Sequence, residues 1–262
     1  MPIAEVRGAR ITYDDTGGEG EPVILAHGFL MDRSMFAPQV DALRATHRVI
    51  TWDERGFGDT EYDGAPFTYW DSAADCLGLL DHLAIERAVV GGMSQGGFVS
   101  LRVALTAPER VLGLVLIDTQ AGPEDADVLP LYQAMIDGWA AEGLSDETAE
   151  VVAGLIVGHP NLNPGWIAKW HARPAAAIAQ PGTTLLTRDD VHDRLHEITV
   201  PALVVHGEDD AAVSVAKGER LAAGLGGPTE LLVVPGGTHA ANLSHPAEVN
   251  AAIASFLATL PT

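Results

Sequence analysis

The stretch AVVGGMSQGGFVSLRVALTA, residues 88–107, decides the fold prediction. Its apolar start, residues 88–91, is typical of a buried strand, and residues 94–107 have the pattern of a helix. Between them Gly92-Met93-Ser94-Gln95-Gly96 matches G-x-S-x-G. Where this motif stands between a strand and a helix, it is typical of a sharp turn that exposes the serine. Small residues at Gly92 and Gly96 give the backbone room to turn, and the Ser94 hydroxyl is then exposed at a helix N-terminus, which favours developing negative charge.

Outward from this turn, apolar runs alternate with helical patterns along the chain. Residues 4–14 alternate apolar and polar around Gly8, which predicts an antiparallel hairpin at one sheet edge. Further strands are predicted at 21–26, 49–52, 111–117, 202–206 and 231–234, and helices at 35–46, from Thr68 onward, and at 246–257. This alternation predicts the α/β class, with a mostly parallel, doubly wound sheet.

Residues 122–198 interrupt the alternation after the strand at 111–117. This interval is too long for a plain loop, so it must carry its own structure. Leu131, Met135 and Trp139 repeat at helical spacing, as do Trp166 and Trp170. We expect a helical cap inserted into a core made of residues 1–121 and 199–262, and not an independent second domain.

Composition and charge narrow the function classes. The 262 residues carry 15 Lys and Arg against 36 Asp and Glu, a formal net charge of −21, which disfavours nucleic acid and anionic membrane surfaces as partners. Cys76 is the only cysteine, so no intramolecular disulfide forms, and its apolar helical setting predicts a buried thiol. No secretory signal or membrane-span pattern is recognised, so we expect a cytoplasmic protein. The oligomeric state stays open.

A serine nucleophile needs a general base and a carboxylate that orients the base. The predicted strand at 202–206 runs into Glu208, Asp209 and Asp210, three competing acids at a strand's carboxyl end. His239 lies on a glycine-rich loop after the next strand, at the same edge of the sheet. The order serine, acid, histidine is the one expected for such a sheet.

Five ordered motifs resemble the α/β-hydrolase fold superfamily, in particular its small bacterial serine esterases, lactonases and cofactor-free haloperoxidase-perhydrolases. They are His27-Gly28-Phe29, the D-x-R-G-x-G pattern at residues 53–58, the serine turn, the acid loop and the histidine loop. The resemblance covers nearly the whole chain. It implies an α/β-hydrolase fold with an N-terminal antiparallel hairpin and a helical cap.

The resemblance also implies roles for individual residues. Ser94, Asp210 and His239 correspond to the catalytic triad, with Asp209 as the second choice for the acid and Asp118 as a rarer position for it. The backbone N–H groups of Phe29 and Gln95 correspond to the oxyanion hole. His27 is expected to shape its loop and Arg55 to anchor its turn.

The implied activity is hydrolysis of a carboxylic ester or lactone with a small-to-medium, largely apolar structure, through an acyl-enzyme and without a cofactor. Alternatives within the fold are a cofactor-free haloperoxidase or perhydrolase, an enol-lactonase, a thioesterase and a carbon–carbon bond hydrolase. A more distant alternative is a ligand-sensing receptor with slow turnover.

The predicted cap offers aromatic candidates for substrate binding. Trp139, Trp166 and Tyr132 are expected either to wall an apolar acyl pocket or to form the cap's own packing core. His192 and His196 have a spacing that suits a metal, but no third ligand accompanies them, so no metal site is predicted.

Overall fold

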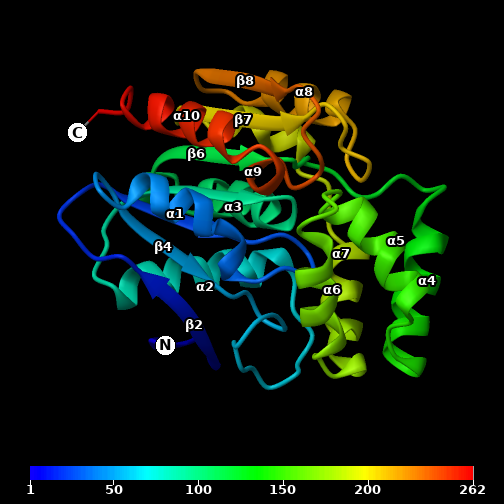
Figure 1. Cartoon of the computed structure of the whole chain (residues 1–262). Coiled ribbons are helices and arrows are strands. Elements are labelled where there is room, and N and C mark those ends of the chain that lie inside the picture. Colours follow the sequence, from blue (N-terminus) through cyan, green and yellow to red (C-terminus); the bar gives the residue numbers. More distant parts are fainter. Residues whose placement is uncertain (262) are drawn as a thin grey trace.

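The computed structural model of the chain describes residues 1–261, which form an eight-stranded sheet (Figure 1). The strand order is β1-β2-β4-β3-β5-β6-β7-β8. The strands are β1 (Ile3–Val6), β2 (Ala9–Asp15), β3 (Pro22–Ala26), β4 (Arg48–Trp52), β5 (Ala88–Met93), β6 (Val111–Ile117), β7 (Ala202–Gly207) and β8 (Thr229–Val234). Strands β3 to β8 are parallel, and β1 and β2 pair antiparallel with their neighbours. The predicted α/β class with an N-terminal antiparallel hairpin is confirmed.

The central strands are apolar on both sides because helices cover both faces of the sheet. In β3, Ile24 and Ala26 belong to one buried hydrophobic cluster, whereas Val23 and Leu25 belong to a second cluster on the opposite face. Successive side chains of a strand point to opposite faces, so one continuous apolar run serves both clusters.

Five helices cover the two faces of the sheet. The face with Ile24 is covered by α2 (Tyr69–His82), α3 (Gln95–Thr106) and α8 (Val215–Gly224), and the other by α1 (Ala37–Leu43) and α10 (Pro246–Leu257). Helix α2 begins with a capping box between Thr68 and Asp71. The predicted apolar face of α10 is buried, and Cys76 is buried within α2, where burial raises the pKa of its thiol.

The structure differs from the sequence predictions in several helices. The helix predicted at residues 35–46 is a 3-10 turn, η1 (Arg33–Phe36), followed by α1, because Asp32 caps the turn by accepting the Ser34 N–H and Pro38 suits the start of a helix. Helices α8 and α9 (Ala241–Ser244) were not predicted. Strand β8 begins two residues earlier than predicted, in a polar stretch typical of an edge strand.

Four helices between β6 and β7 lie together beside one end of the sheet (Figure 1). They are α4 (Leu129–Glu142), α5 (Asp146–Ile156), α6 (Asn163–His171) and α7 (Ala179–Leu186). Among residues 1–261 the remaining helical elements are short 3-10 turns: η2 (Pro108–Arg110) before β6, and η3 (Ala175–Ile178) and η4 (His192–Glu197) between β6 and β7. The indole N–H of Trp170 donates to the Leu30 carbonyl over 2.7 Å, which ties α6 to the loop after β3. The division into a core and an inserted cap stays a prediction.

None of these helices, over residues 1–261, combines the length and apolarity of a segment that crosses a bilayer.

Candidate active site

Ser94 lies at the junction of β5 and α3 with a left-handed backbone, φ 51° and ψ −110°. A residue with a side chain is strained at such a φ, so its surroundings must hold it there. The Ser94 N–H donates to the Ile117 carbonyl over 2.8 Å, and the Thr119 hydroxyl donates to the Ser94 carbonyl over 2.7 Å. The end of β6 therefore holds the strained turn from both sides.

The glycines on either side of Ser94 leave room that no side chain would fit. A Cβ on Gly96 would lie 1.9 Å from the Ala26 carbonyl oxygen, and a Cβ on Gly92 would lie 2.4 Å from the Gly96 carbonyl carbon. Both obstacles are backbone atoms, which do not move aside as a flexible side chain does. The spacing of the G-x-S-x-G motif thus has the steric basis that the sequence indicated.

Asp210 and His239 meet at the carboxyl edge of the sheet. The Nδ1 atom of His239 lies 2.8 Å from Oδ2 of Asp210. The other carboxylate oxygen accepts the N–H groups of Ala212 and Val213, each over 2.8 Å. Because a carboxylate only accepts, Nδ1 carries the proton and Nε2 of His239 is left as a base.

Charge and burial act in opposite directions on this pair. Burial of His239 lowers its pKa, but the charge and hydrogen bond of Asp210 outweigh that effect, so the pKa of the imidazole lies above its usual value. Burial of Asp210 raises its pKa, and the charge of His239 with hydrogen bonds from His206 and His239 holds it well below the usual range. Asp210 is therefore an anion, and it stabilises an imidazolium at His239.

The competing acids have other surroundings. Glu208 and Asp209 are exposed, and neither makes a hydrogen bond to His239 within residues 1–261. Asp118 is fully buried with a φ of 47°, and its two carboxylate oxygens accept the N–H groups of Gly207 and Ala241 over 2.7 and 2.9 Å. Asp118 therefore joins the loops that carry Asp210 and His239, a bridging role that the sequence did not predict.

Asp118, His206 and Asp210 also form the one group in the described chain that has metal-ligand geometry, with ligand atoms within 4.8 Å of one another. These atoms already serve protein hydrogen bonds: His206 Nε2 donates to the Val213 carbonyl over 2.7 Å and lies 3.2 Å from Asp210 Oδ2. The three side chains therefore serve to hold the loop after β7 that carries Asp210. His192, considered above with His196, instead makes a 2.7 Å contact with Asp190 through Nδ1.

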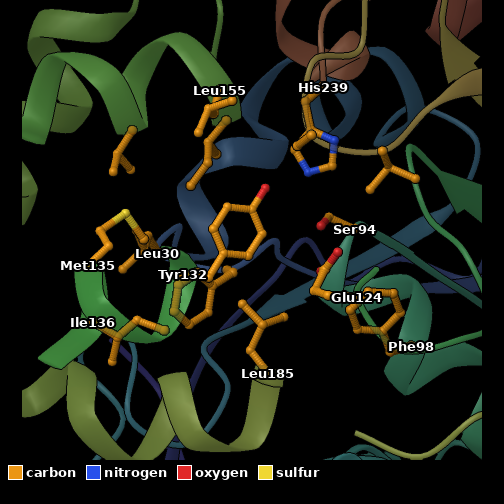
Figure 2. Close-up of a pocket in the computed structure, with 15 residues that line it drawn as sticks. Leu30, Ser94, Phe98, Glu124, Tyr132, Met135, Ile136, Leu155, Leu185 and His239 are labelled. Carbon is orange, nitrogen blue, oxygen red and sulfur yellow. The ribbon is translucent and has the colours of Figure 1, made fainter. Parts of the chain in front are cut away.

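Ser94 and His239 both line a pocket between the sheet edge and the helices α4, α5 and α7, and Figure 2 draws them on the same side of it. Most of its wall is apolar. The lining residues are Phe29, Leu30, Ser94, Phe98, Glu124, Tyr132, Met135, Ile136, Val152, Leu155, Ile156, Leu185, Ala212, Val213 and His239. A mostly apolar lining with a few polar groups is typical of a site for a small molecule.

The three aromatic residues predicted for substrate binding separate in the structure. Tyr132 lines the pocket, and Figure 2 shows its hydroxyl pointing toward Ser94 and His239. Trp139 and Trp166 do not belong to the pocket wall; both are buried in the hydrophobic cluster that also contains Ile136 of the wall. Their bulk packs the helices together, which was the second of the two expectations for them.

The two backbone N–H groups predicted for the oxyanion hole are free to bind a ligand. Within residues 1–261, neither the Phe29 N–H nor the Gln95 N–H donates to a protein acceptor. Gln95 is the first residue of α3, where N–H groups have no partner inside the helix. The Gln95 side chain accepts a hydrogen bond from the Tyr69 hydroxyl over 3.0 Å, which turns it away from the pocket wall.

His27 and Arg55 stabilise the loops that follow β3 and β4. His27 Nδ1 donates to the Gly28 carbonyl over 2.8 Å, and its Nε2 accepts the Glu54 N–H over 3.0 Å. Arg55 forms a bidentate ion pair with Asp75 of α2. Both side chains act within the fold, as the sequence led us to expect.

Two acidic residues at or near the site were missed by the sequence analysis. Glu124 lines the pocket, but it lies in an acidic stretch before α4 that carries no motif. Glu54 is fully buried behind the serine turn, where burial, partly opposed by the polar side chains of Gln95 and Ser72, raises its pKa to about 8. No local pattern marks either position, because its surroundings come from distant segments.

Comparisons with known proteins identify the family of the chain. A family model described as the alpha/beta hydrolase fold matches residues 21–163, and one described as TAP-like protein matches residues 169–262. A relative from Synechocystis, provisionally named a non-heme chloroperoxidase, is 31% identical over 94% of each chain. A thermophilic esterase from Thermogutta terrifontis and an enol-lactonase from Burkholderia xenovorans share 27% and 26% identity, each with a TM-score of 0.89, over 98% of this chain and 98% and 100% of theirs. The chain belongs to the α/β hydrolase fold family of enzymes.

Proposed function

We propose that the protein is a serine hydrolase that cleaves a carboxylic ester or lactone through an acyl-enzyme. Ser94 is the nucleophile, His239 the general base and Asp210 the acid that orients the base. The observation that carries the proposal is the 2.8 Å contact between His239 Nδ1 and Asp210 Oδ2, with His239 and Ser94 on the wall of one apolar pocket.

In the acylation step, the Ser94 oxygen attacks the substrate's carbonyl carbon while His239 Nε2 takes the hydroxyl proton. The carbonyl oxygen becomes an oxyanion, and the free N–H groups of Phe29 and Gln95 stabilise it, a contribution of about 2.7–4 kcal/mol per donor. Asp210 stabilises the imidazolium. The imidazolium then donates its proton to the alkoxide, which leaves as an alcohol, or stays attached when the substrate is a lactone.

In the deacylation step, water replaces the alcohol. His239 Nε2 takes a proton from the water, the resulting hydroxide attacks the acyl carbon, and a second oxyanion forms in the same place. Collapse of this intermediate breaks the bond to Ser94, whose oxygen recovers the proton from His239. The products are the carboxylic acid and the free enzyme.

Hydrogen peroxide in place of water would give a peracid instead of the acid, and this is the second candidate function. The Synechocystis relative's name favours testing it. Peroxide-dependent halogenation of a dye, measured beside ester hydrolysis on one preparation, separates the two reactions.

The first test is steady-state hydrolysis of p-nitrophenyl esters of increasing acyl length by the wild type, Ser94→Ala and Asp210→Asn. We expect turnover with an optimum in chain length, set by the apolar pocket, and loss of that turnover in Ser94→Ala. Turnover of these esters by Ser94→Ala at the wild-type rate would refute the proposal.

A further inference from the structure

Glu124 is the one carboxylate among the residues that line the pocket in the described chain. Its side chain is only 10% exposed, and it lines the same pocket as Ser94 (Figure 2). A carboxylate is costly to bury unless it is paired or hydrogen-bonded. The surroundings of its two oxygens therefore indicate what the pocket is built to bind.

One oxygen is held from behind by a buried arginine. Arg188 Nη2 lies 2.9 Å from Glu124 Oε1, and the arginine side chain is 1% exposed. Two carbonyls, those of Gly122 and Leu185, accept its remaining hydrogen bonds over 2.8 Å each, and its guanidinium stacks 4.4 Å from the ring centre of Phe98. The arginine fixes the orientation of the carboxylate and balances its charge without entering the pocket wall.

The second oxygen, Glu124 Oε2, accepts no hydrogen bond from any group in residues 1–261. It is a fixed acceptor in an apolar space, and a bound molecule that offers an O–H or N–H would satisfy it. The ion pair with Arg188 is already neutral, so an uncharged donor fits better than an ammonium group, which would add an unbalanced charge. A free carboxylate would face Glu124 as a like charge.

We propose that Glu124 is a specificity-determining residue that selects esters or lactones carrying a neutral hydrogen-bond donor, a hydroxyl or an amide N–H, close to the scissile carbonyl. The same residue excludes substrates that carry a free carboxylate there. This inference rests on the proposed ester or lactone hydrolysis at Ser94, and it adds the chemical class of the substrate.

The test compares esters that differ in one group, each assayed for kcat/KM by acid release. The acyl series is methyl butanoate, methyl 3-hydroxybutanoate, methyl 3-oxobutanoate, N-acetylglycine methyl ester and monomethyl succinate; the alcohol series is propyl and 2-hydroxyethyl butanoate. In at least one series the wild type is expected to prefer the donor-bearing ester over its plain counterpart by roughly 10-fold to 100-fold, the range of a hydrogen bond to a charged group. The succinate ester is expected to be the poorest substrate.

Glu124→Gln is the informative variant, because its amide oxygen keeps the bond to Arg188 and its NH₂ group then faces the pocket. The pocket acceptor becomes a donor, so the 3-oxo ester is expected to overtake methyl butanoate, and the penalty on the succinate ester is expected to fall. Asp127→Asn removes a carboxylate from the same acidic stretch at an exposed position and is the matched control. The control is expected to keep the wild-type order of substrates.

Failure of the inference is distinguishable from failure of the proposed function. Ser94-dependent hydrolysis at equal kcat/KM for donor-bearing and plain esters in both series overturns the role of Glu124 alone, as does a wild-type order of substrates in Glu124→Gln. If the wild type hydrolyses none of these esters, no p-nitrophenyl ester and no simple lactone such as γ-butyrolactone, the proposed function fails. Calorimetric binding of the same ester pairs to Ser94→Ala then tests the acceptor without turnover, and equal affinity for the paired esters overturns it.

Discussion

Replacing Glu54 by glutamine tests the electrostatics behind the serine turn. The carboxyl group of Glu54 is fully buried, and its pKa rises from an ordinary 4.5 to about 8 in the folded protein. A carboxylic acid with a raised pKa stabilises the fold below the unfolded-state pKa, and this contribution is lost as the pH rises through the folded-state pKa. Ionisation of Glu54 in the unfolded chain therefore lowers the free energy of unfolding of the wild type progressively between about pH 4.5 and pH 8.

The size of the effect follows from the same two values. Each pH unit across which only the unfolded chain is ionised costs about 1.4 kcal/mol, so the full interval lowers the free energy of unfolding by at most about 5 kcal/mol. Glu54→Gln has a similar shape but no ionisable group. We expect its free energy of unfolding, relative to wild type, to rise by a few kcal/mol between pH 5 and pH 9.

Urea denaturation at pH 5, 7 and 9, analysed with a common slope, measures this difference directly. Glu230→Gln, a substitution of the same chemistry at an exposed position, is the control and is expected to show no such trend. A Glu54→Gln variant whose stability relative to wild type is the same at pH 5 and pH 9 would refute the reasoning about burial.

Three further predictions concern the catalytic pair, the turn and the buried thiol. His239 acts as a base only when unprotonated, and Asp210 raises its pKa, so the acid limb of the pH dependence of kcat/KM is expected above pH 6.5. In Asp210→Asn this limb is expected to move to lower pH and kcat to fall by about 10⁴-fold. Profiles of rate against pH for both proteins measure these effects. Gly96→Ala places a Cβ against a backbone carbonyl of β3, so its free energy of unfolding, measured by thermal denaturation, is expected to fall by about 3 kcal/mol or more. Gly165 has open space around it, and Gly165→Ala is expected to show no such loss of stability. Cys76 is expected to react with a thiol reagent only after unfolding, and rapid labelling of the native protein would contradict its burial.

The parts of the fold that depend on neighbouring residues were predictable from the sequence. The strands from β3 to β7 are each built on a short apolar run, and the strand, turn and helix around Ser94 follow one another within 20 residues. The relation between the loops of Asp210 and His239 was predictable too, since the carboxyl ends of adjacent parallel strands meet at one edge of the sheet.

The parts that depend on distant segments were not predictable. Glu124 faces the pocket because Arg188, 64 residues later, fixes its carboxylate, and no spacing rule connects the two. Trp139 and Tyr132 lie on the same helix, but only the structure shows that Tyr132 lines the pocket while Trp139 is buried outside its wall. Packing against other helices sets the direction in which each side chain of α4 points. A periodic pattern in the sequence indicates only whether a side chain is buried or exposed.

Covalent trapping at Ser94 tests the central claim most directly. The wild type would be incubated with a p-nitrophenyl phosphonate, which a nucleophilic serine attacks, and the adduct located by peptide mass spectrometry beside an assay of ester hydrolysis. The account predicts one adduct, on Ser94, formed in step with loss of hydrolysis, and neither adduct nor hydrolysis in Ser94→Ala. Ester hydrolysis that survives in Ser94→Ala, or an inactivating adduct on another residue, would contradict it.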